Sequence, residues 1–224
     1  RLVRVLGEQD SIAHLGLGMS LWSLALFALA ATQALRAVLL LALTAAVLLA
    51  VSWLHFSIRR RREAPRTPSL AVRCSALSPP STAMLAALGV AAALWFFFSA
   101  LPSIGWDDAV YHLRLPRLYL EHGGFRWVRF SVFSHWPQGM EMLYALAMVL
   151  RDYVAAKLLH GSLAVLTCVL VYRIARRRCG TVASLAGAGL LAANPVFLFE
   201  ARFAYVDAAL AFFLLLAFRD ALAT

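Results

Sequence analysis

Three acidic residues stand where a mostly apolar sequence can do chemistry. Asp107 and Asp108 are adjacent, and Asp207 stands at the head of a later apolar run. Two neighbouring carboxylates suit a general base, or the binding of a divalent cation, which is the one cofactor that the sequence suggests. An aspartate at a helix start can equally be an N-cap for exposed backbone N–H groups. The sequence leaves both roles open, and it offers Arg202 as an ion-pair partner for Asp207.

The residues between these acidic points could bind a substrate. Tyr111 and the nearby tryptophans can stack on a sugar or anchor the chain at a membrane surface. Arg114 and Arg126 can hold a phosphate through charge-assisted hydrogen bonds, or they can contact lipid head groups. His112 and His135 add polar side chains, but no H-E-x-x-H or H-x-H spacing predicts a zinc site.

The elements that must position these residues are apolar helices. Hydrophobic residues make up 62% of the chain, charged residues make up 14%, and the mean hydropathy is +0.78. A soluble domain needs a more highly charged surface, so soluble enzymes, secreted disulfide scaffolds and ordinary DNA-binding domains are excluded. The sequence predicts an all-α polytopic membrane protein with about six transmembrane helices. The expected spans are residues 12–31, 36–56, 81–101, 153–175 and 182–199, and a sixth that begins near Asp207.

Arginine-rich loops predict the orientation of the chain. One loop runs from Arg59 to Arg73 and contains a single acid, and the other runs from Arg173 to Arg178 and contains none. By the positive-inside rule both loops are cytoplasmic, so an even number of spans separates them. Residues 102–152 then form one outer region, in which five basic and five acidic residues balance. The net charge of +10 is therefore a topology signal, and a nucleic-acid partner is excluded.

The outer region contains a further apolar segment, residues 139–150. About 12 residues are too few to cross a bilayer, so we expect a helix that lies in the membrane interface. The alternative is that this segment only extends the helix that follows it.

The chain divides into three parts. Residues 1–58 are expected to form a two-helix membrane hairpin, residues 59–80 a basic, proline-containing linker, and residues 81–224 a transmembrane module with a catalytic outer loop at 102–152. Because the first residue is Arg1 and the last lies just past an apolar run, we expect a fragment of a longer protein.

Three stretches of the sequence carry a resemblance to a known family. They are W-D-D-A-V-Y-H-L-R-L-P-R-L-Y-L-E-H-G from Trp106, F-S-H-W-P-Q-G-M-E-M-L from Phe133, and N-P-V-F-L-F-E-A-R-F-A-Y-V-D from Asn194. In order, spacing and sidedness they resemble the N-terminal part of GT-C glycosyltransferases. The most similar members are bacterial enzymes of the family 39 type, related to protein O-mannosyltransferases and lipid A aminoarabinose transferases. The resemblance covers about residues 85–220.

The resemblance implies a function and roles for individual residues. It implies a membrane glycosyltransferase that moves a sugar from a polyprenyl phosphate to an acceptor hydroxyl on the outer face of the bacterial cytoplasmic membrane. Asp107 matches the catalytic acid of the family, Asp108 matches its neighbour, and Tyr111 matches the tyrosine that follows. Asp207 matches a later aspartate at the head of a span. The acceptor, whether lipid, glycan or protein, is not specified.

The sequence departs from the family pattern at two positions. Some members carry an Arg where this chain has Val110, and some carry a Lys where it has Trp136. These basic groups help to hold the lipid phosphate in those relatives. In this chain the role would pass to other basic residues of the outer region: Arg114, Arg126, Arg129 or His135.

Two other functions are compatible with the same residues. A transporter or lipid-binding protein without catalysis could use the outer acids to bind ions or a substrate, although transporters favour broken helices in repeated halves and no repeat is visible. The chain could also be an inactive part of the transferase that lacks later spans.

Overall fold

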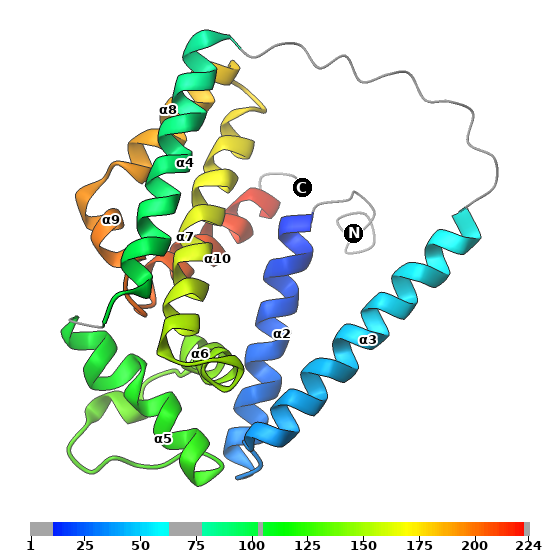
Figure 1. Ribbon diagram of the computed structural model, residues 1–224, viewed down its shortest axis with the longest axis vertical. Coiled ribbons are helices and arrows are strands. Elements are labelled where there is room, and N and C mark those ends of the chain that lie inside the picture. Colours follow the sequence, from blue (N-terminus) through cyan, green and yellow to red (C-terminus); the bar gives the residue numbers. More distant parts are fainter. Residues whose placement is uncertain (1–10, 63–77, 103–104, 222–224) are drawn as a thin grey trace.

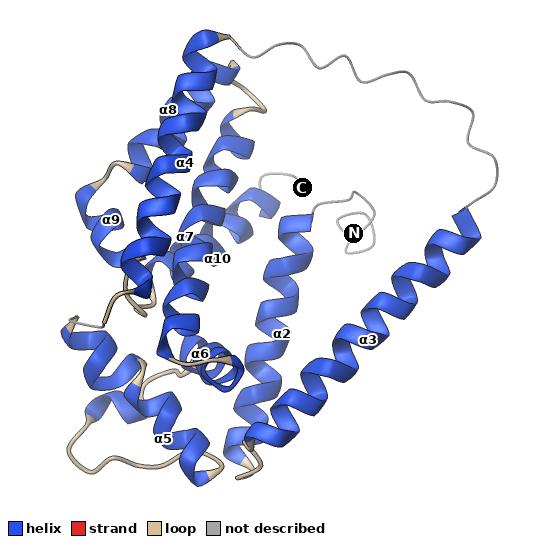
Figure 2. Ribbon diagram, viewed as in Figure 1, coloured by secondary structure: helices blue, strands red, loops and turns tan. Residues whose placement is uncertain are grey.

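The computed structural model describes residues 11–62, 78–102 and 105–221, and these residues are helical wherever they have regular structure (Figure 2). The predicted all-α fold class is thus confirmed for the described part of the chain. The helices in chain order are α2 (Ser11–Ala31), α3 (Ala37–Arg62), α4 (Pro79–Ala100), the π-helical turn η1 (Asp108–His112), α5 (Arg114–His122), the 3₁₀ turn η2 (Val132–His135), α6 (Gly139–Leu150), α7 (Tyr153–Ala175), α8 (Thr181–Ala192), α9 (Pro195–Ala201) and α10 (Asp207–Ala221).

Three of the described helices, α2, α4 and α7, are long and apolar enough to cross a bilayer. Helices α8 and α9 meet the same criterion only as a pair, which is bent by 68°. The sequence predicts a span over residues 182–199, and the structure divides this stretch between two helices that form at most one bent span. Asn194 instead caps α9 by accepting hydrogen bonds from the backbone of Val196 and Phe197. Pro195 follows it, and a proline disfavours helical backbone at the preceding residue.

The two remaining predicted spans, over residues 36–56 and from Asp207 onward, correspond to helices α3 and α10. Helix α3 has an apolar part of 17 residues, Ala37–Trp53, and α10 has 15 residues. Large apolar side chains face outward on several helices, among them Leu24 at 67% exposure and Leu190 at 76%. Such a surface is costly in water and suits contact with lipid.

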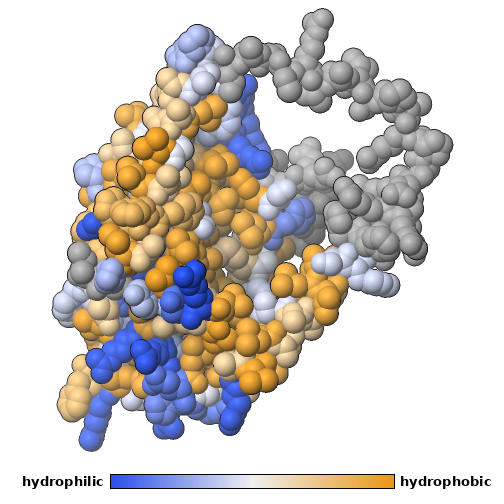
Figure 3. Space-filling view, in the orientation of Figure 1, coloured by the Kyte–Doolittle hydropathy of each residue, from blue (hydrophilic) through white to orange (hydrophobic). Residues whose placement is uncertain are grey.

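Helix α7 lies at the centre of the bundle and packs against α4, α6, α8 and α10 (Figure 1). Helix α6 lies across the end of α7 as a separate helix, because Arg151 and Asp152 are not helical. Asp152 caps α7 by accepting a hydrogen bond from the backbone N–H of Val154. Segment 139–150 is therefore not an extension of α7. Hydrophilic side chains gather at this end of the molecule, around α5, whereas apolar ones cover much of the upright helices (Figure 3).

Helix α2 packs against α6 and α10, whereas α3 diverges from the bundle (Figure 1). The turn between α2 and α3 docks on segment 105–150, where Leu35 donates its backbone N–H to the carbonyl of Gly123 at 2.7 Å. Gly124 must be small here, because a Cβ would lie 2.5 Å from the carbonyl oxygen of Ala30. The N-terminal hairpin thus shares a packed surface with the segment that carries the acidic residues.

Candidate functional site

The end of α4 and the turn η1 place the two adjacent aspartates. Lys157, which is buried in α7, donates to the carbonyl of Leu101 at 2.6 Å and so fixes the end of α4. Asp107 precedes the wide π-helical turn η1, whose last hydrogen bond runs from the N–H of Leu113 to the carbonyl of Asp108 at 2.9 Å. Single π-helical turns are common at functional sites.

Asp107 and Asp108 differ in access to solvent. Asp108 is fully buried, with 0% of its surface exposed, whereas Asp107 is half-buried. Asp107 makes no side-chain capping hydrogen bond, so the N-cap alternative is not observed for it. Gly105 makes room for Asp108, because a Cβ there would lie 3.0 Å from the Tyr205 hydroxyl and 3.2 Å from Asp108 Oδ1. Of the pair, Asp107 is the carboxylate that a substrate can reach.

The two acidic points of the sequence both influence the hydroxyl of Tyr111. Burial and then the charge and hydrogen bonding of Asp107 raise the pKa of the Tyr111 hydroxyl well above its usual range, with further contributions from Glu141 and Asp207. The segments that carry these acidic residues also meet directly, because the ring of Tyr205, two residues before Asp207, lies 6.0 Å from that of His112. We call Asp107, Asp108, Glu141 and Asp207 the acidic site.

The segment between α9 and α10 closes the acidic site on another side. Burial, followed by the charges of Asp107 and Asp108, raises the pKa of the Tyr205 hydroxyl. The carbonyl of Tyr205 accepts a hydrogen bond from the buried hydroxyl of Tyr144 in α6. Asp207 follows as the first residue of α10, where a negative charge is favourable towards the helix dipole.

Aromatic rings form an exposed wall next to Tyr111. Phe133 stacks on Tyr111 with ring centroids 4.0 Å apart, and Trp136 meets both rings edge to face. Trp106 meets Phe133 edge to face, with 6.1 Å between the ring centroids. Trp106 and Trp136 remain 63% and 51% exposed, so their faces are accessible to a ligand. Exposed aromatic faces beside carboxylates suit the binding of a sugar.

Glu141 is a member of the site for which the sequence analysis assigned no role. It stands in the first turn of α6, is 4% exposed and lies with Oε1 2.6 Å from Nδ1 of His112. A lone carboxylate in the apolar segment G-M-E-M-L-Y-A-L-A-M-V-L is itself a signal, because a charge there needs a partner. The partner, however, is 29 residues away and cannot be identified from local spacing.

The basic residues predicted to bind phosphate lie elsewhere. Arg114 and Arg126 are exposed, and His135 is exposed beside Trp127, with 4.2 Å between the ring centroids. Across the described ranges no ion pair or hydrogen bond joins any of them to the acidic site.

Arg202 does not take the place expected for it either. Its guanidinium lies over the rings of Phe199 and Phe203, 4.7 Å and 4.6 Å from their centroids, and no ion pair with Asp207 is present in the described part of the chain. Its Nε and the neighbouring Glu200 Oε2 are buried without a hydrogen-bond partner there. The possible ion pair of Arg202 with Asp207 is therefore not formed among the described residues, because Arg202 packs on aromatic rings instead.

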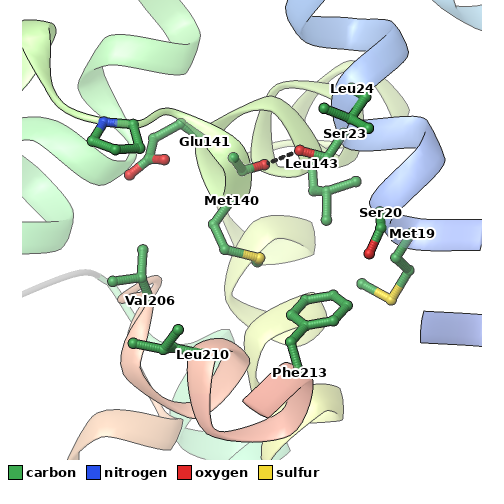
Figure 4. Close-up of a pocket in the computed structure, with 12 residues that line it drawn as sticks. Met19, Ser20, Ser23, Leu24, Met140, Glu141, Leu143, Val206, Leu210 and Phe213 are labelled. Carbon is green, nitrogen blue, oxygen red and sulfur yellow. Dashed lines mark hydrogen bonds between the residues drawn. The ribbon is translucent and has the colours of Figure 1, made fainter. Parts of the chain in front are cut away.

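An apolar groove of about 450 Å³ adjoins the acidic site (Figure 4). It lies between α2, α6 and α10, and the side chains of Met19, Met140 and Phe213 point into it. Its polar residues are Ser20, Ser23 and Glu141 and, as Figure 4 shows, the hydroxyl of Ser23 donates to a backbone carbonyl on α6, that of Gly139, at 2.7 Å. Glu141 thus belongs both to the groove and to the acidic site.

The described residues do not hold a ready-made metal centre: within them, no three His, Cys, Asp or Glu side chains are placed to bind one ion. A divalent cation at Asp107 and Asp108 would need further oxygen ligands from its substrate.

Comparison with known proteins gives no match to a family model, a curated protein or a solved structure. The function must therefore be argued from the residues and their geometry.

Proposed function

We propose that the chain carries the catalytic loop of a multi-pass membrane glycosyltransferase of the GT-C type. In this proposal the enzyme moves a sugar from a polyprenyl phosphate to an acceptor hydroxyl on the outer face of the cytoplasmic membrane. The observation that carries the proposal is that the segments holding Asp107 and Asp207, which are 100 positions apart in the sequence, meet at one end of an apolar helical bundle, where the rings of His112 and Tyr205 lie 6.0 Å apart.

Asp107 is the general base of the proposed reaction. It is the accessible carboxylate of the pair, and it makes no helix-capping bond that would occupy it. Asp107 takes the proton of the acceptor hydroxyl while that oxygen attacks the anomeric carbon, and the carbon–phosphate oxygen bond breaks on the opposite face of the sugar. The configuration is inverted as a result. A well-placed base contributes about 10²–10⁴-fold in rate.

The surroundings of Asp107 support a lipid-linked sugar as donor. The exposed rings of Trp106 and Trp136 offer a surface on which a sugar can stack. The groove between α2, α6 and α10 is apolar along most of its lining and reaches the acidic site at Glu141. Its volume of about 450 Å³ falls within the usual range of ligand pockets, about 300–1,000 Å³. A hydrocarbon chain in the groove would present its phosphate end to the acidic site.

The same groove also supports a second candidate, a lipid-binding or transport protein without catalysis. The two candidates differ in what Asp107 does. A binding protein needs the shape and charge of Asp107 only for affinity, whereas the transferase needs the basicity of Asp107 for turnover.

Substitution of Asp107 by Asn tests the proposal. We expect Asp107→Asn to lower sugar transfer by about 10²-fold or more, because an amide cannot accept the proton. The assay follows transfer from a panel of decaprenyl-phosphate hexoses and pentoses, labelled in the sugar, to acceptors in proteoliposomes. Glu121→Gln is the matched control, because Glu121 is exposed and paired with Arg117 at 2.9 Å. Transfer by Asp107→Asn at the wild-type rate would exclude the proposed mechanism. A wild-type chain that cross-links to a photoreactive decaprenyl phosphate without transferring sugar would support the binding protein.

A further inference from the structure

His112 and Glu141 form a buried pair within the site. They are 5% and 4% exposed, and 2.6 Å separates Nδ1 of His112 from Oε1 of Glu141. An ionised carboxylate can only accept a hydrogen bond, so beside ionised Glu141 it is Nδ1 that carries the proton. Glu141 thereby selects which of the two imidazole nitrogens is left for other partners, and it ties η1 to α6 across 29 residues.

The free nitrogen of His112 belongs to the interior of the site. The imidazole lies against Tyr111, with 4.0 Å between ring centroids, and 6.0 Å from the ring of Tyr205. It is close enough to Glu200 for their charges to interact. Glu141 is the only side chain that hydrogen-bonds to His112 within the described residues, so Nε2 remains available to a ligand.

Among the basic side chains near the site, His112 is the one whose ring lies inside it and has a nitrogen to spare. Lys157 already donates to the carbonyl of Leu101, and Arg202 lies over aromatic rings. Arg114 and Arg126 are exposed. A protonated imidazole that is paired with a buried carboxylate keeps a strong donor in a place from which water is largely excluded.

We propose that Glu141 is a positioning residue, which holds His112 so that Nε2–H donates to the phosphate of the lipid-linked sugar. This inference rests on the proposed function and adds a role for a residue outside the predicted set. The sugar phosphodiester carries one negative charge. When its bond to the anomeric carbon breaks, the electron pair stays on the phosphate oxygen and the departing monoester carries two. The acceptor proton goes to Asp107, and the hydrogen bond from His112 stabilises the charge that develops on the phosphate.

The decisive variant is Glu141→Gln, which keeps the size of the side chain and removes its charge. We expect kcat to fall at least about tenfold, since the loss of a side chain that orients a functional group commonly costs about 10–100-fold. The KM for a decaprenyl-phosphate sugar should change by less than about twofold, because the hydrogen bond gains strength mainly in the transition state. Glu121→Gln is the control, and Glu141→Asp should restore part of kcat. A wild-type kcat in Glu141→Gln would overturn the proposal.

Nitrogen NMR of ¹⁵N-histidine-labelled protein in nanodiscs gives a readout that does not depend on turnover. His112 is assigned by comparison with His112→Gln. Nδ1 should be protonated in the wild type, and addition of decaprenyl phosphate should shift the Nε2 resonance in the wild type but not in Glu141→Gln. An unprotonated Nδ1, or no shift in the wild type, would overturn the proposal. If the wild type transfers no sugar but its Nε2 resonance still shifts, the transferase function would be overturned, whereas the binding of phosphate at His112 would stand.

Discussion

The two halves of segment 105–150 are held in the molecule in different ways. In the half around η1, Tyr111 and His112 are buried and contact α6 and the segment before α10. In the half around η2, Arg126 and His135 are exposed, and their charges meet water. Electrostatic effects on chemistry are therefore expected in the half around η1, because a charge in a buried site acts on its neighbours several times more strongly than the same charge in water.

The largest effect on stability is expected from the buried half, at Tyr144. Its hydroxyl donates to the carbonyl of Tyr205 and joins α6 to the segment that leads into Asp207. Tyr144→Phe leaves this buried carbonyl without its donor, which should lower the free energy of unfolding by about 1–3 kcal/mol. Thermal unfolding in detergent, followed by tryptophan fluorescence, measures the change.

Tyr153→Phe is the matched control for Tyr144→Phe, because Tyr153 is 39% exposed and its substitution should cost less than about 0.5 kcal/mol. Equal stability of the two variants would mean that the contact between α6 and Tyr205 does not hold the site together, and the contrast between the two halves would fail.

An intermediate effect is expected in the titration of Tyr111. Burial and the carboxylate of Asp107 raise the pKa of its hydroxyl, so the folded protein keeps this phenol neutral where the unfolded chain ionises it. The resulting stabilisation is fully present below about pH 10, the pKa of an unperturbed tyrosine, and it is lost as the pH rises through the higher pKa of the folded state. Tyr111→Phe should therefore unfold at a higher alkaline pH than the wild type.

Ultraviolet difference spectra sharpen this test. The tyrosinate signal assigned to Tyr111, by subtraction of the Tyr111→Phe spectrum, should appear at a lower pH in Asp107→Asn, because one of the nearby negative charges is removed. The same onset with and without the Asp107 charge would show that the aspartate does not act on Tyr111.

Local pattern was sufficient for the long apolar helices and insufficient for the pairing of side chains. Runs of apolar residues located α2, α4 and α7 because their length and composition are properties of one segment. The same reasoning overlooked the break before Pro195, since apolar composition on both sides outweighed the restriction that a proline places on its neighbour. The pair of His112 and Glu141 could not be found in this way, because only tertiary packing brings η1 and α6 together.

The smallest effects are expected in the exposed half, and they decide whether the phosphate is held there or at His112. The resemblance to GT-C enzymes assigns to Arg126 and His135 the binding of the lipid phosphate, which basic groups at other positions perform in some members. Both residues, however, are exposed. An exposed charge is screened by water and salt, so Arg126→Gln and His135→Gln should each change the free energy of unfolding by less than about 0.5 kcal/mol. For the same reason we expect sugar transfer to fall by no more than about twofold, and raised ionic strength to abolish even that difference. A loss of transfer as large as that of Glu141→Gln would assign the phosphate to the η2 half, because only direct contact with the substrate could make an exposed arginine or histidine so important.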